Sequence, residues 1–251
     1  MKLSVITICL NDLEGLKRTV NSVVAQSFND FEYIVIDGGS TDGTIDFLKK
    51  QETKIAKFVS EKDAGIYNAM NKGIALANGE YCLFLNSGDY LVNDDVLMSV
   101  FLQNKSEDIL YGNMIIESEN GSRRHGKMPK ELSFVHMIGD TLWHPVSFIS
   151  KSLFDKYGMY DESLKMVSDY DFFLKVICLH KVSTAYLNFP IAVFNLKGFS
   201  SLPENRRILE MERNIVQKRY FLEDQLLRAY KKIEFNNSLL GRIINKLGLR
   251  S

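Results

Sequence analysis

The chain has 251 residues, 45% apolar and 25% charged, which is typical of a folded globular protein, and its zero net charge gives no argument for binding nucleic acid. Its cysteines, Cys9, Cys82 and Cys178, are too few and too scattered for a disulfide framework or a zinc site. The apolar run Leu3–Leu10 has no cleavage site after it, and no run reaches the ~18 residues of a transmembrane helix, so we expect a cytoplasmic protein.

The first hundred residues alternate short apolar segments with helical patterns. Four buried strands are predicted at Leu3–Cys9, Phe31–Ile36, Ile55–Val59 and Tyr81–Leu85, because these segments are short, apolar and rich in β-branched or aromatic residues. Helices are expected between them: one capped by Asn11 or Asp12 and ending at Gln26, one capped by Thr41 or Asp42, and one over Ile66–Ala77. This alternation requires right-handed crossovers and predicts an α/β fold with a mostly parallel central sheet and flanking helices.

The alternation weakens after Asp89. A short helix is predicted at Val96–Leu102 and a longer one at Ser168–Leu179, with extended segments at 109–117, 146–149, Val182–Tyr186 and Ala192–Leu196. Apolar residues recur at helical spacing from Ile208 to Ile233, which predicts one long amphipathic helix, and a second short one follows at Leu239–Leu247. Residues 206–251 hold 11 Lys+Arg and 5 Asp+Glu, so a basic tail (+6) follows an acidic body (−6).

Polar and acidic residues follow three of the predicted strands. Asp37–Thr44 follows the second strand, Ser60–Gly73 begins at the end of the third, and Asn86–Asp89 follows the fourth. In an open α/β sheet, ligands bind outside the carboxyl ends of the strands. These residues therefore predict a site for a phosphorylated, metal-associated ligand, although the glycines match neither a dinucleotide-binding fingerprint nor a P-loop.

The acids nearest this edge each have a functional and a structural interpretation. Asp37 can accept a hydrogen bond from the imide N–H of a base, or it can form an Asx-turn; we favour the ligand contact. For Asp42 we favour a helix cap. Asp89 can bind Mg²⁺ or Mn²⁺ together with substrate phosphates, but taken by itself the tetrapeptide favours a plain turn with Asp89 as a cap, because such tetrapeptides are common.

Two further groups stand in the second half of the chain. Asp169 and Asp171 lie ~200° apart around a helix, so only one of them can face a cleft as a base. Both can instead be acids favoured by the positive end of the helix dipole. Trp143 and His144 offer an aromatic platform for a sugar ring, or they pack in a partly buried position.

Taken together, these segments resemble the family 2 glycosyltransferases, inverting enzymes with the Rossmann-like GT-A nucleotide-sugar fold. The resemblance covers residues 3 to about 201 and rests on Val5–Thr7 with Asn11, Ile36–Thr44, Ser60–Gly73, Phe84–Asp89, His144, Ser168–Asp171 and Gly198–Ser200. Within the family, the chain is similar to transferases that build bacterial exopolysaccharide, colanic acid or O-antigen repeat units.

The resemblance implies a role for individual positions. Asp37 would hold the nucleobase, Asp63 would lie by the nucleoside, Asp89 would hold Mn²⁺ or Mg²⁺ on the diphosphate, and Asp169 would be the general base. The donor site would comprise Thr7, Asn11, Asp37, Gly39, Asp63, Asn71 and Ser87, and the acceptor site Trp143 and His144. Two departures matter: Asn86 and Gly88 stand where many members carry Asp, and Ser168 replaces the usual Glu before the base.

The resemblance also implies partners and organisation. We expect a catalytic domain over 1–205, with a nucleotide-sugar half (about 1–100) and an acceptor half (about 101–205), followed by a basic amphipathic helical tail over 206–251. The donor would be a nucleotide-diphosphate sugar, with a UDP-sugar favoured, and the acceptor a glycan or a lipid-linked saccharide. Apart from the resemblance, the +6 charge of the tail and the amphipathic spacing of Leu239–Leu247 predict that residues 239–250 bring the enzyme to the inner face of the membrane as a peripheral protein. The helix over 208–233 would pack on the catalytic domain or on a second subunit of a homodimer.

Two other classes of protein remain as alternatives. A nucleotide-sugar pyrophosphorylase would need a loop rich in Gly and Lys or Arg after the first strand, where this chain has Cys9–Asp12. A binding module without activity is the non-enzyme alternative, and the intact set of Asp37, Asp89 and Asp169 argues against it.

Overall fold

The computed structural model describes residues 1–196, 198 and 203–238. Its strands form one nine-stranded sheet in the order β3-β2-β1-β4-β8-β6-β9-β5, with β7 paired to β6. The strands are β1 (Leu3–Cys9), β2 (Phe31–Asp37), β3 (Lys57–Ser60), β4 (Tyr81–Phe84), β5 (Tyr90–Leu91), β6 (Ile109–Glu117), β7 (Arg123–Gly126), β8 (Ser147–Ser150) and β9 (Thr184–Asn195).

Most of the described strands run in one direction. β1 is parallel to β2 and β4, and β2 is parallel to β3. β8 is antiparallel to both β4 and β6, so β6 and its parallel neighbour β9 run the same way as β4. β5 and β7 run the opposite way. The expected α/β fold with a mostly parallel central sheet is therefore confirmed.

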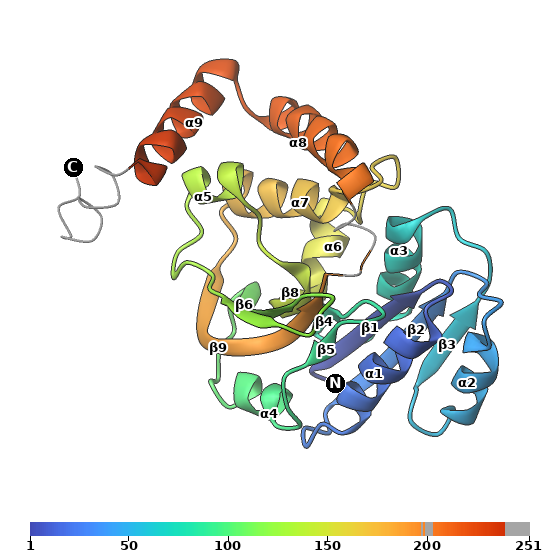
Figure 1. The fold of residues 1–251 in the computed structure, drawn as a ribbon. Coiled ribbons are helices and arrows are strands. Elements are labelled where there is room, and N and C mark those ends of the chain that lie inside the picture. The colour runs from blue at the N-terminus through green and yellow to red at the C-terminus, as the bar shows by residue number, and fades with distance from the viewer. Residues whose placement is uncertain (197, 199–202, 239–251) are drawn as a thin grey trace.

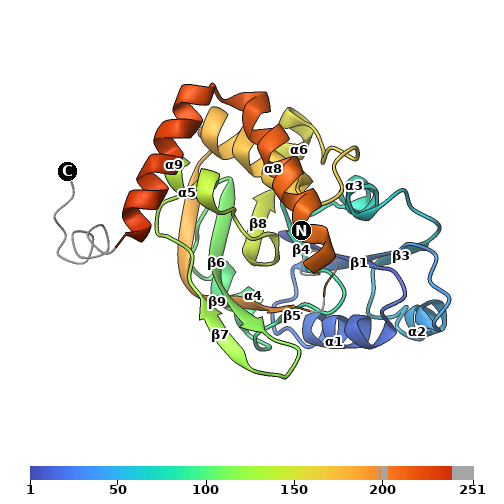
Figure 2. The same ribbon diagram turned by 45° about the horizontal axis from the view of Figure 1, so that its top comes forward.

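Helices cover both faces of the sheet (Figures 1 and 2). One face carries α1 (Leu13–Val24), α2 (Thr44–Lys50) and α4 (Val96–Phe101). The other carries α3 (Ile66–Leu76), α5 (Phe134–Gly139), α6 (Lys151–Tyr157), α7 (Ser168–Phe173), α8 (Arg206–Tyr220) and α9 (Glu223–Asn237). Two 3₁₀ turns, η1 (His144–Val146) and η4 (Pro203–Asn205), and a π-helical turn, η2 (Leu174–Leu179), complete the described elements.

The buried residues of β1 explain this three-layer arrangement. Leu3 and Val5 belong to the apolar cluster under α1, whereas Ile6 and Ile8 belong to the cluster under α3. Side chains alternate across a strand, and every residue of β1 is buried, including the polar Ser4 and Thr7, so helices must cover both faces. This is the reason why apolar residues occur on both faces of β1 and do not alternate strictly with exposed polar ones.

The first half differs little from the expectation. Asp12 is the N-cap of α1, and its carboxylate accepts the N–H of Gly15 at 3.1 Å. The N-cap of α2 is Gly43, in left-handed conformation, and Asp42 accepts the N–H of Thr44 at 3.1 Å from the position before it. The third strand begins two residues later than expected, at Lys57.

The second half needs three corrections. The segments Val182–Tyr186 and Ala192–Leu196 belong to one strand, β9, which passes Pro190 at an irregularity in its register with β6. The helix expected over Ser168–Leu179 is α7 followed by the π-helical turn η2. A single helix from Ile208 to Ile233 was the wrong prediction, because α8 and α9 are separate helices.

The break between α8 and α9 coincides with a tertiary contact of Phe221. Phe221 is extended, and its ring packs edge-on against Phe134 of α5 at 4.8 Å between centroids. The turn directs α9 onto α5, where Ile233 packs against Gly139. The helical spacing of apolar residues continues through the break, because both helices bury their apolar residues in the same apolar cluster. As expected, these helices pack on the rest of the chain, with Val216, Leu226 and Ala229 buried.

Within the described residues, no helix is long and apolar enough to cross a membrane. The short helix expected at Leu239–Leu247, and the proposed membrane contact of residues 239–250, lie outside the described residues.

Candidate functional site

The carboxyl ends of the parallel strands bring the predicted donor residues to one edge of the sheet. Cys9 of β1, Asp37 of β2 and Ser60 of β3 stand in register with one another. The segment Asn86–Asp89 follows β4, next to β1, and the N–H of Ser87 donates to the Ile8 carbonyl at 3.0 Å. The strand ends and the loops that follow them therefore lie side by side at one edge of the sheet, as the sequence predicts.

Asp37 organises the turn after β2. It is fully buried, and its carboxylate accepts the Ser60 hydroxyl at 2.6 Å and the N–H groups of Gly39 and Ser40 at 3.2 and 3.1 Å. Gly39 has φ +87°, a conformation that a side chain disfavours. Asp63 lies directly over Gly38, since a Cβ there would come within 2.4 Å of its Oδ2. Asp37, Gly39 and Asp63 are thus close together.

A second group surrounds the end of β1. Asn11 receives the N–H of Thr41 at 2.9 Å through its side-chain oxygen, and its own N–H donates to Ser40 at 2.7 Å. The Ser87 hydroxyl donates to the Asp12 carboxylate. These contacts link the three loops of the edge and place Asn11 and Ser87 on it, together with Asp12, which the sequence indicated only as a helix cap.

Two of the predicted donor residues have their side chains engaged away from these loops. Thr7 is fully buried, and its hydroxyl donates to the Leu85 carbonyl at 2.7 Å and hydrogen-bonds Tyr33 at 3.0 Å. Asn71 of α3 donates to the carbonyl of Tyr160 at 2.9 Å and to Glu162 at 2.8 Å, and accepts the Tyr160 N–H at 3.0 Å. Both side chains contribute to the framework behind the site.

Asp169, on the first turn of α7, meets side chains from other elements. Its Oδ1 accepts the Tyr67 hydroxyl of α3 at 2.9 Å, and its Oδ2 lies 3.2 Å from Nδ1 of His144. Nε2 of His144 in turn lies 3.3 Å from the Asn86 side-chain nitrogen. A series of side-chain contacts, Tyr67–Asp169–His144–Asn86, therefore connects α3, α7, η1 and the end of β4.

These contacts set the protonation of Asp169. Burial raises the pKa of this carboxyl, but the hydrogen bonds and charge of His144 and the hydrogen bond from Tyr67 outweigh it, so the pKa lies below the usual 3.8. The side chain is still 16% exposed. Asp169 is therefore an ionised, partly accessible carboxylate with fixed orientation, which is what a general base requires. The Ser168 hydroxyl is buried without a hydrogen-bond partner, so Tyr67 and His144, and not Ser168, orient this carboxylate.

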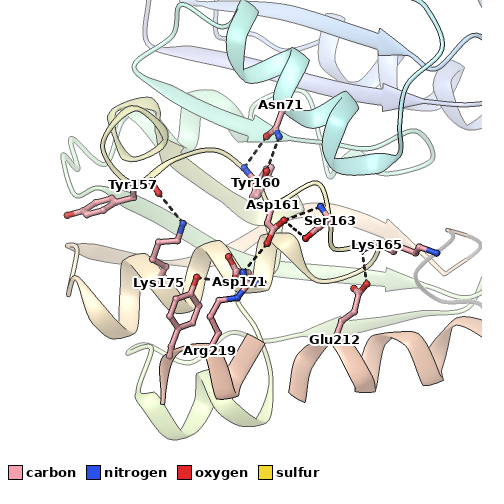
Figure 3. A network of polar contacts seen from close by, with 11 residues as sticks. Asn71, Tyr157, Tyr160, Asp161, Ser163, Lys165, Asp171, Lys175, Glu212 and Arg219 are labelled. Carbon is pink, nitrogen blue, oxygen red and sulfur yellow. Dashed lines mark hydrogen bonds and ion pairs between the residues drawn. The ribbon is translucent and has the colours of Figure 1, made fainter. Parts of the chain in front are cut away.

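Asp171, two residues further along α7, points toward Arg219 of α8 (Figure 3). It is buried, and its Oδ1 accepts the Arg219 guanidinium at 2.9 Å and the Tyr220 hydroxyl at 3.0 Å, both from α8. Burial raises its pKa, partly offset by these two donors. Arg219 also binds Asp161 at 3.0 Å, and Glu212 of α8 accepts the N–H of Lys165 at 2.8 Å. Asp171 joins α7 to α8.

The predicted acceptor pair divides between two environments. His144 is bound to Asp169, as described, and its side chain is 18% exposed. Trp143 packs its ring over Gly126 at the end of β7, where a Cβ would lie 2.9 Å from the ring. It also contacts both apolar clusters, so packing accounts for much of its surface.

Asp89 was predicted to bind the cation. Its side chain is buried and accepts the N–H of Asn195 at 3.0 Å, and burial raises its pKa to about 7. Among the described residues, no group of three or more His, Cys, Asp or Glu side chains could hold a metal ion. The side-chain oxygen of Asn86, however, is buried without a hydrogen-bond partner. An amide oxygen and one carboxylate fit Mg²⁺ or Mn²⁺ when substrate phosphates supply the remaining ligands.

Sequence reasoning missed Tyr67 and Arg219. Tyr67 lies in the Ser60–Gly73 segment, but 102 residues separate it from Asp169. Arg219 looked like one of many cations in a basic tail. No local pattern identifies either contact, because both depend on how α3 and α8 pack against α7.

Comparison with known proteins gives matches over most of the chain. A family model described as "Glycosyl transferase family 2" matches residues 4–166. An uncharacterized glycosyltransferase of Mycobacterium tuberculosis (strain CDC 1551 / Oshkosh) is 39% identical over 176 residues, which cover 68% of this chain and 67% of that protein. A PGL/p-HBAD biosynthesis glycosyltransferase of Mycobacterium bovis (strain BCG / Pasteur 1173P2) is 30% identical over 201 residues, which cover 78% and 77% of the two chains.

Solved structures share the fold at lower identity. S. aureus TarS 1–349 in complex with UDP-GlcNAc has a TM-score of 0.70 and 22% identity, with 95% of this chain and 74% of that chain covered. The mannosyltransferase PcManGT from Pyrobaculum calidifontis, in complex with GDP-Man and Mn²⁺, has a TM-score of 0.59 and 13% identity over 99% and 79% of the chains.

Proposed function

The chain belongs to glycosyl transferase family 2, and from this premise we propose that it is an inverting enzyme that transfers a sugar from a nucleotide-diphosphate sugar to a hydroxyl group of a glycan or lipid-linked acceptor. We place this reaction in the biosynthesis of a bacterial surface polysaccharide such as exopolysaccharide or O-antigen. The name of one relative, a PGL/p-HBAD biosynthesis glycosyltransferase, and the UDP-GlcNAc and GDP-Man complexes of two structural neighbours support this class of substrate.

The observation that carries the proposal is the environment of Asp169. Its carboxylate is ionised, partly accessible and held by Tyr67 and His144. It takes the proton of the acceptor hydroxyl as that oxygen attacks the anomeric carbon, which contributes ~10²–10⁴-fold to the rate. The nucleotide diphosphate leaves from the opposite face of the sugar, so the anomeric configuration inverts.

Tyr67 and His144 act through Asp169. Each of them donates to a different carboxylate oxygen, and each oxygen keeps a second lone pair for the acceptor hydroxyl. Asn86 lies against Nε2 of His144, so Nδ1 carries the proton that points to Asp169 when the ring is neutral. The same Asn86 belongs to the loop of Asp89, and it connects the base to the donor side of the site.

The donor occupies the edge formed by the strand ends. In this proposal, the turn of Asp37 and Gly39, with Asp63 beside it, receives the nucleoside, and Asn11 and Ser87 line the neighbouring loops; Thr7 and Asn71 support the edge from behind. Asp89 and the Asn86 oxygen would hold Mn²⁺ or Mg²⁺ beside the diphosphate of the donor. When bound, the cation neutralises the charge that develops on the leaving group.

The remaining part of the proposal concerns organisation. Residues 1–205 form the catalytic domain, with Trp143 and His144 on its acceptor side, and residues 239–250 of the basic tail bring it to the inner face of the membrane, where a lipid-linked acceptor is found. A bilayer with anionic lipids attracts such a segment.

The test is incubation of the protein with a panel of UDP-, GDP- and dTDP-sugars and Mn²⁺, with and without acceptor saccharides, while nucleotide diphosphate is measured. We expect release from one donor class, greater with acceptor, and a raised melting temperature with the matching diphosphate. Pyrophosphate-dependent formation of nucleoside triphosphate would indicate a pyrophosphorylase instead. Binding of a donor without any release, at every acceptor tried, would indicate a module that binds but does not react.

A further inference from the structure

Two grooves lie on either side of α5. The first, of about 410 Å³, lies where α5 meets the end of η2 and the start of α9, and Phe134 and Phe221 are among its apolar lining residues. The second, of about 790 Å³, is lined by the segment Lys127–Lys130 together with His136 and Tyr186. We call this surface, grooves included, the α5 face. It lies on the side of the molecule opposite α2 (Figure 1).

The charged side chains that line the two grooves are all basic. Lys181, Arg228 and Lys232 line the first groove, and Lys127 and Lys130 the second, with no acidic residue in either lining. Arg228 forms an ion pair with the exposed Asp224 at 2.6 Å, whereas the four lysines have no ion pair within the described residues. Four exposed ammonium groups thus lie around a short helix, and two acids near them, Glu131 beside Lys130 and Asp140 at the end of α5, form no ion pair with them among the described residues.

Apolar side chains reach solvent beside these cations. Leu222, next to the groove residue Phe221, is 71% exposed, and Leu179, two residues before Lys181, is 41% exposed. Lys181 itself has φ +53°, so a non-glycine residue holds a left-handed conformation at the rim of the first groove. Exposed leucines close to lysines without an ion pair favour binding to the interface of an anionic bilayer, because the leucines enter the interfacial layer and the lysines attract lipid phosphates.

We propose that the α5 face docks on a membrane that carries anionic phospholipids, with lipid phosphates at the cationic rims of the grooves and Leu222 and Leu179 in the interfacial layer. A second copy of the chain is disfavoured, because a twofold interface would bring these cations against themselves. The described chain ends beyond α9 at Ser238, and the sequence that follows adds Arg242, Lys246 and Arg250 without an acid, so its charge favours the same partner. This docking does not depend on the chemistry proposed for Asp169.

Sedimentation of the full chain with vesicles tests the proposal. We compare phosphatidylcholine vesicles with vesicles that also contain phosphatidylglycerol, and expect binding only to the second kind. In the first variant, Lys181→Asn, Arg228→Gln and Lys232→Gln remove three cations; Asn tolerates the backbone of position 181. Since each cation near the surface contributes about fivefold to partitioning, the variant should bind on the order of a hundredfold less.

Three further variants make the result specific. Lys49→Gln, Lys50→Gln and Lys54→Gln remove the same charge from exposed positions at the end of α2, and should reduce binding far less. Leu222→Ser removes an exposed apolar group at the N-cap of α9, where Ser caps well, and should weaken binding severalfold without loss of stability. Neutralising Arg242, Lys246 and Arg250 together shows what the following segment contributes; we expect residual binding.

Several outcomes would overturn the proposal. Equal losses in the α5-face and α2 variants would mean that only overall charge matters. Unchanged binding in the α5-face variant, with complete loss in the variant neutralised at residues 242–250, would assign docking to that segment alone. A dimer in solution that the α5-face variant converts to a monomer would show that a second copy covers this surface.

Discussion

The first turn of α7 presents two aspartates, two residues apart, to two different regions of the molecule. Asp169 faces the strand ends and meets Tyr67 and His144. Asp171 faces α8 and meets Arg219 and Tyr220. Burial opposes ionisation of both, yet the pKa of Asp169 is lowered and that of Asp171 raised. Helix geometry separates the two side chains, and their partners then decide what each carboxyl group can do.

The two regions also differ in how accessible the carboxyl group is, which supports our proposal that Asp169 is the base and Asp171 a structural acceptor. Asp169 keeps 16% of its side chain accessible, whereas the side chain of Asp171 is only 4% exposed. A base has to reach its substrate, whereas a structural acceptor performs best where water is excluded. The network of Figure 3 shows that Asp171 and Arg219 hold the loop over residues 160–165 between α3 and α8.

The largest effect on stability should come from Asp171→Ala. This variant leaves the Tyr220 hydroxyl and one contact of Arg219 without an acceptor, and should lower the free energy of unfolding by about 2–4 kcal/mol. Asp171→Asn keeps an acceptor oxygen and removes a charge that burial disfavours, so it should cost much less. Urea unfolding measures both. Equal losses for Ala and Asn would show that the charge, and not the acceptor, is what α8 requires.

The next effect concerns the connection of α3 to the same loop. Asn71→Ala removes three hydrogen bonds to Tyr160 and Glu162 and should destabilise the protein by about 2 kcal/mol. Asn68→Ala on the same helix is the matched control, since its contacts to Glu162 and Ala64 are solvent-exposed and should matter less. Thermal unfolding distinguishes them. A larger loss in donor binding than in stability for Asn71→Ala would instead support its predicted contact with the nucleotide sugar.

A smaller effect is expected on the donor side. Asp89→Ala should weaken nucleotide-diphosphate binding in Mn²⁺ by about tenfold and change binding in EDTA little, because the carboxylate acts through the cation. Titration calorimetry in the two buffers gives the comparison. Should wild-type binding be indifferent to EDTA, the cation has no role, and Asp89 only holds the Asn195 backbone.

The smallest effect should be a displacement of the pH profile. His144→Ala removes the donor that lowers the pKa of Asp169 while burial remains, so the pKa of Asp169 rises. The base is active when ionised, and the acid limb of kcat/KM should therefore move to higher pH. His144→Asn can place an amide N–H near the position of Nδ1 and should restore the profile in part. An unmoved acid limb in the Ala variant would leave His144 as a packing or acceptor residue.

The sequence was sufficient for the regions where local pattern and tertiary structure agree. Short runs rich in β-branched residues correctly predicted the strands β1 to β4. The acids that follow these strands predicted that the polar loops meet at one edge of the sheet, because parallel strands end side by side. It was insufficient where distant contacts decide. Nothing near Phe221 signals that packing on Phe134 ends α8, and spacing alone left Asp169 and Asp171 equivalent as candidates. Asp169 was preferred as the general base because of the family resemblance. The contacts that fit it for this proposed role come from α3 and η1, which pack against α7.

The most direct test of the account is a parallel measurement of Asp169→Asn and Asp171→Asn with the donor identified by the nucleotide-sugar panel. We predict that Asp169→Asn lowers turnover at least ~10²-fold while the dissociation constant of the nucleotide diphosphate stays nearly unchanged, and that Asp171→Asn retains turnover within severalfold of wild type. If Asp171→Asn abolishes turnover and Asp169→Asn spares it, the assignment of the two regions is reversed and the proposed base is wrong.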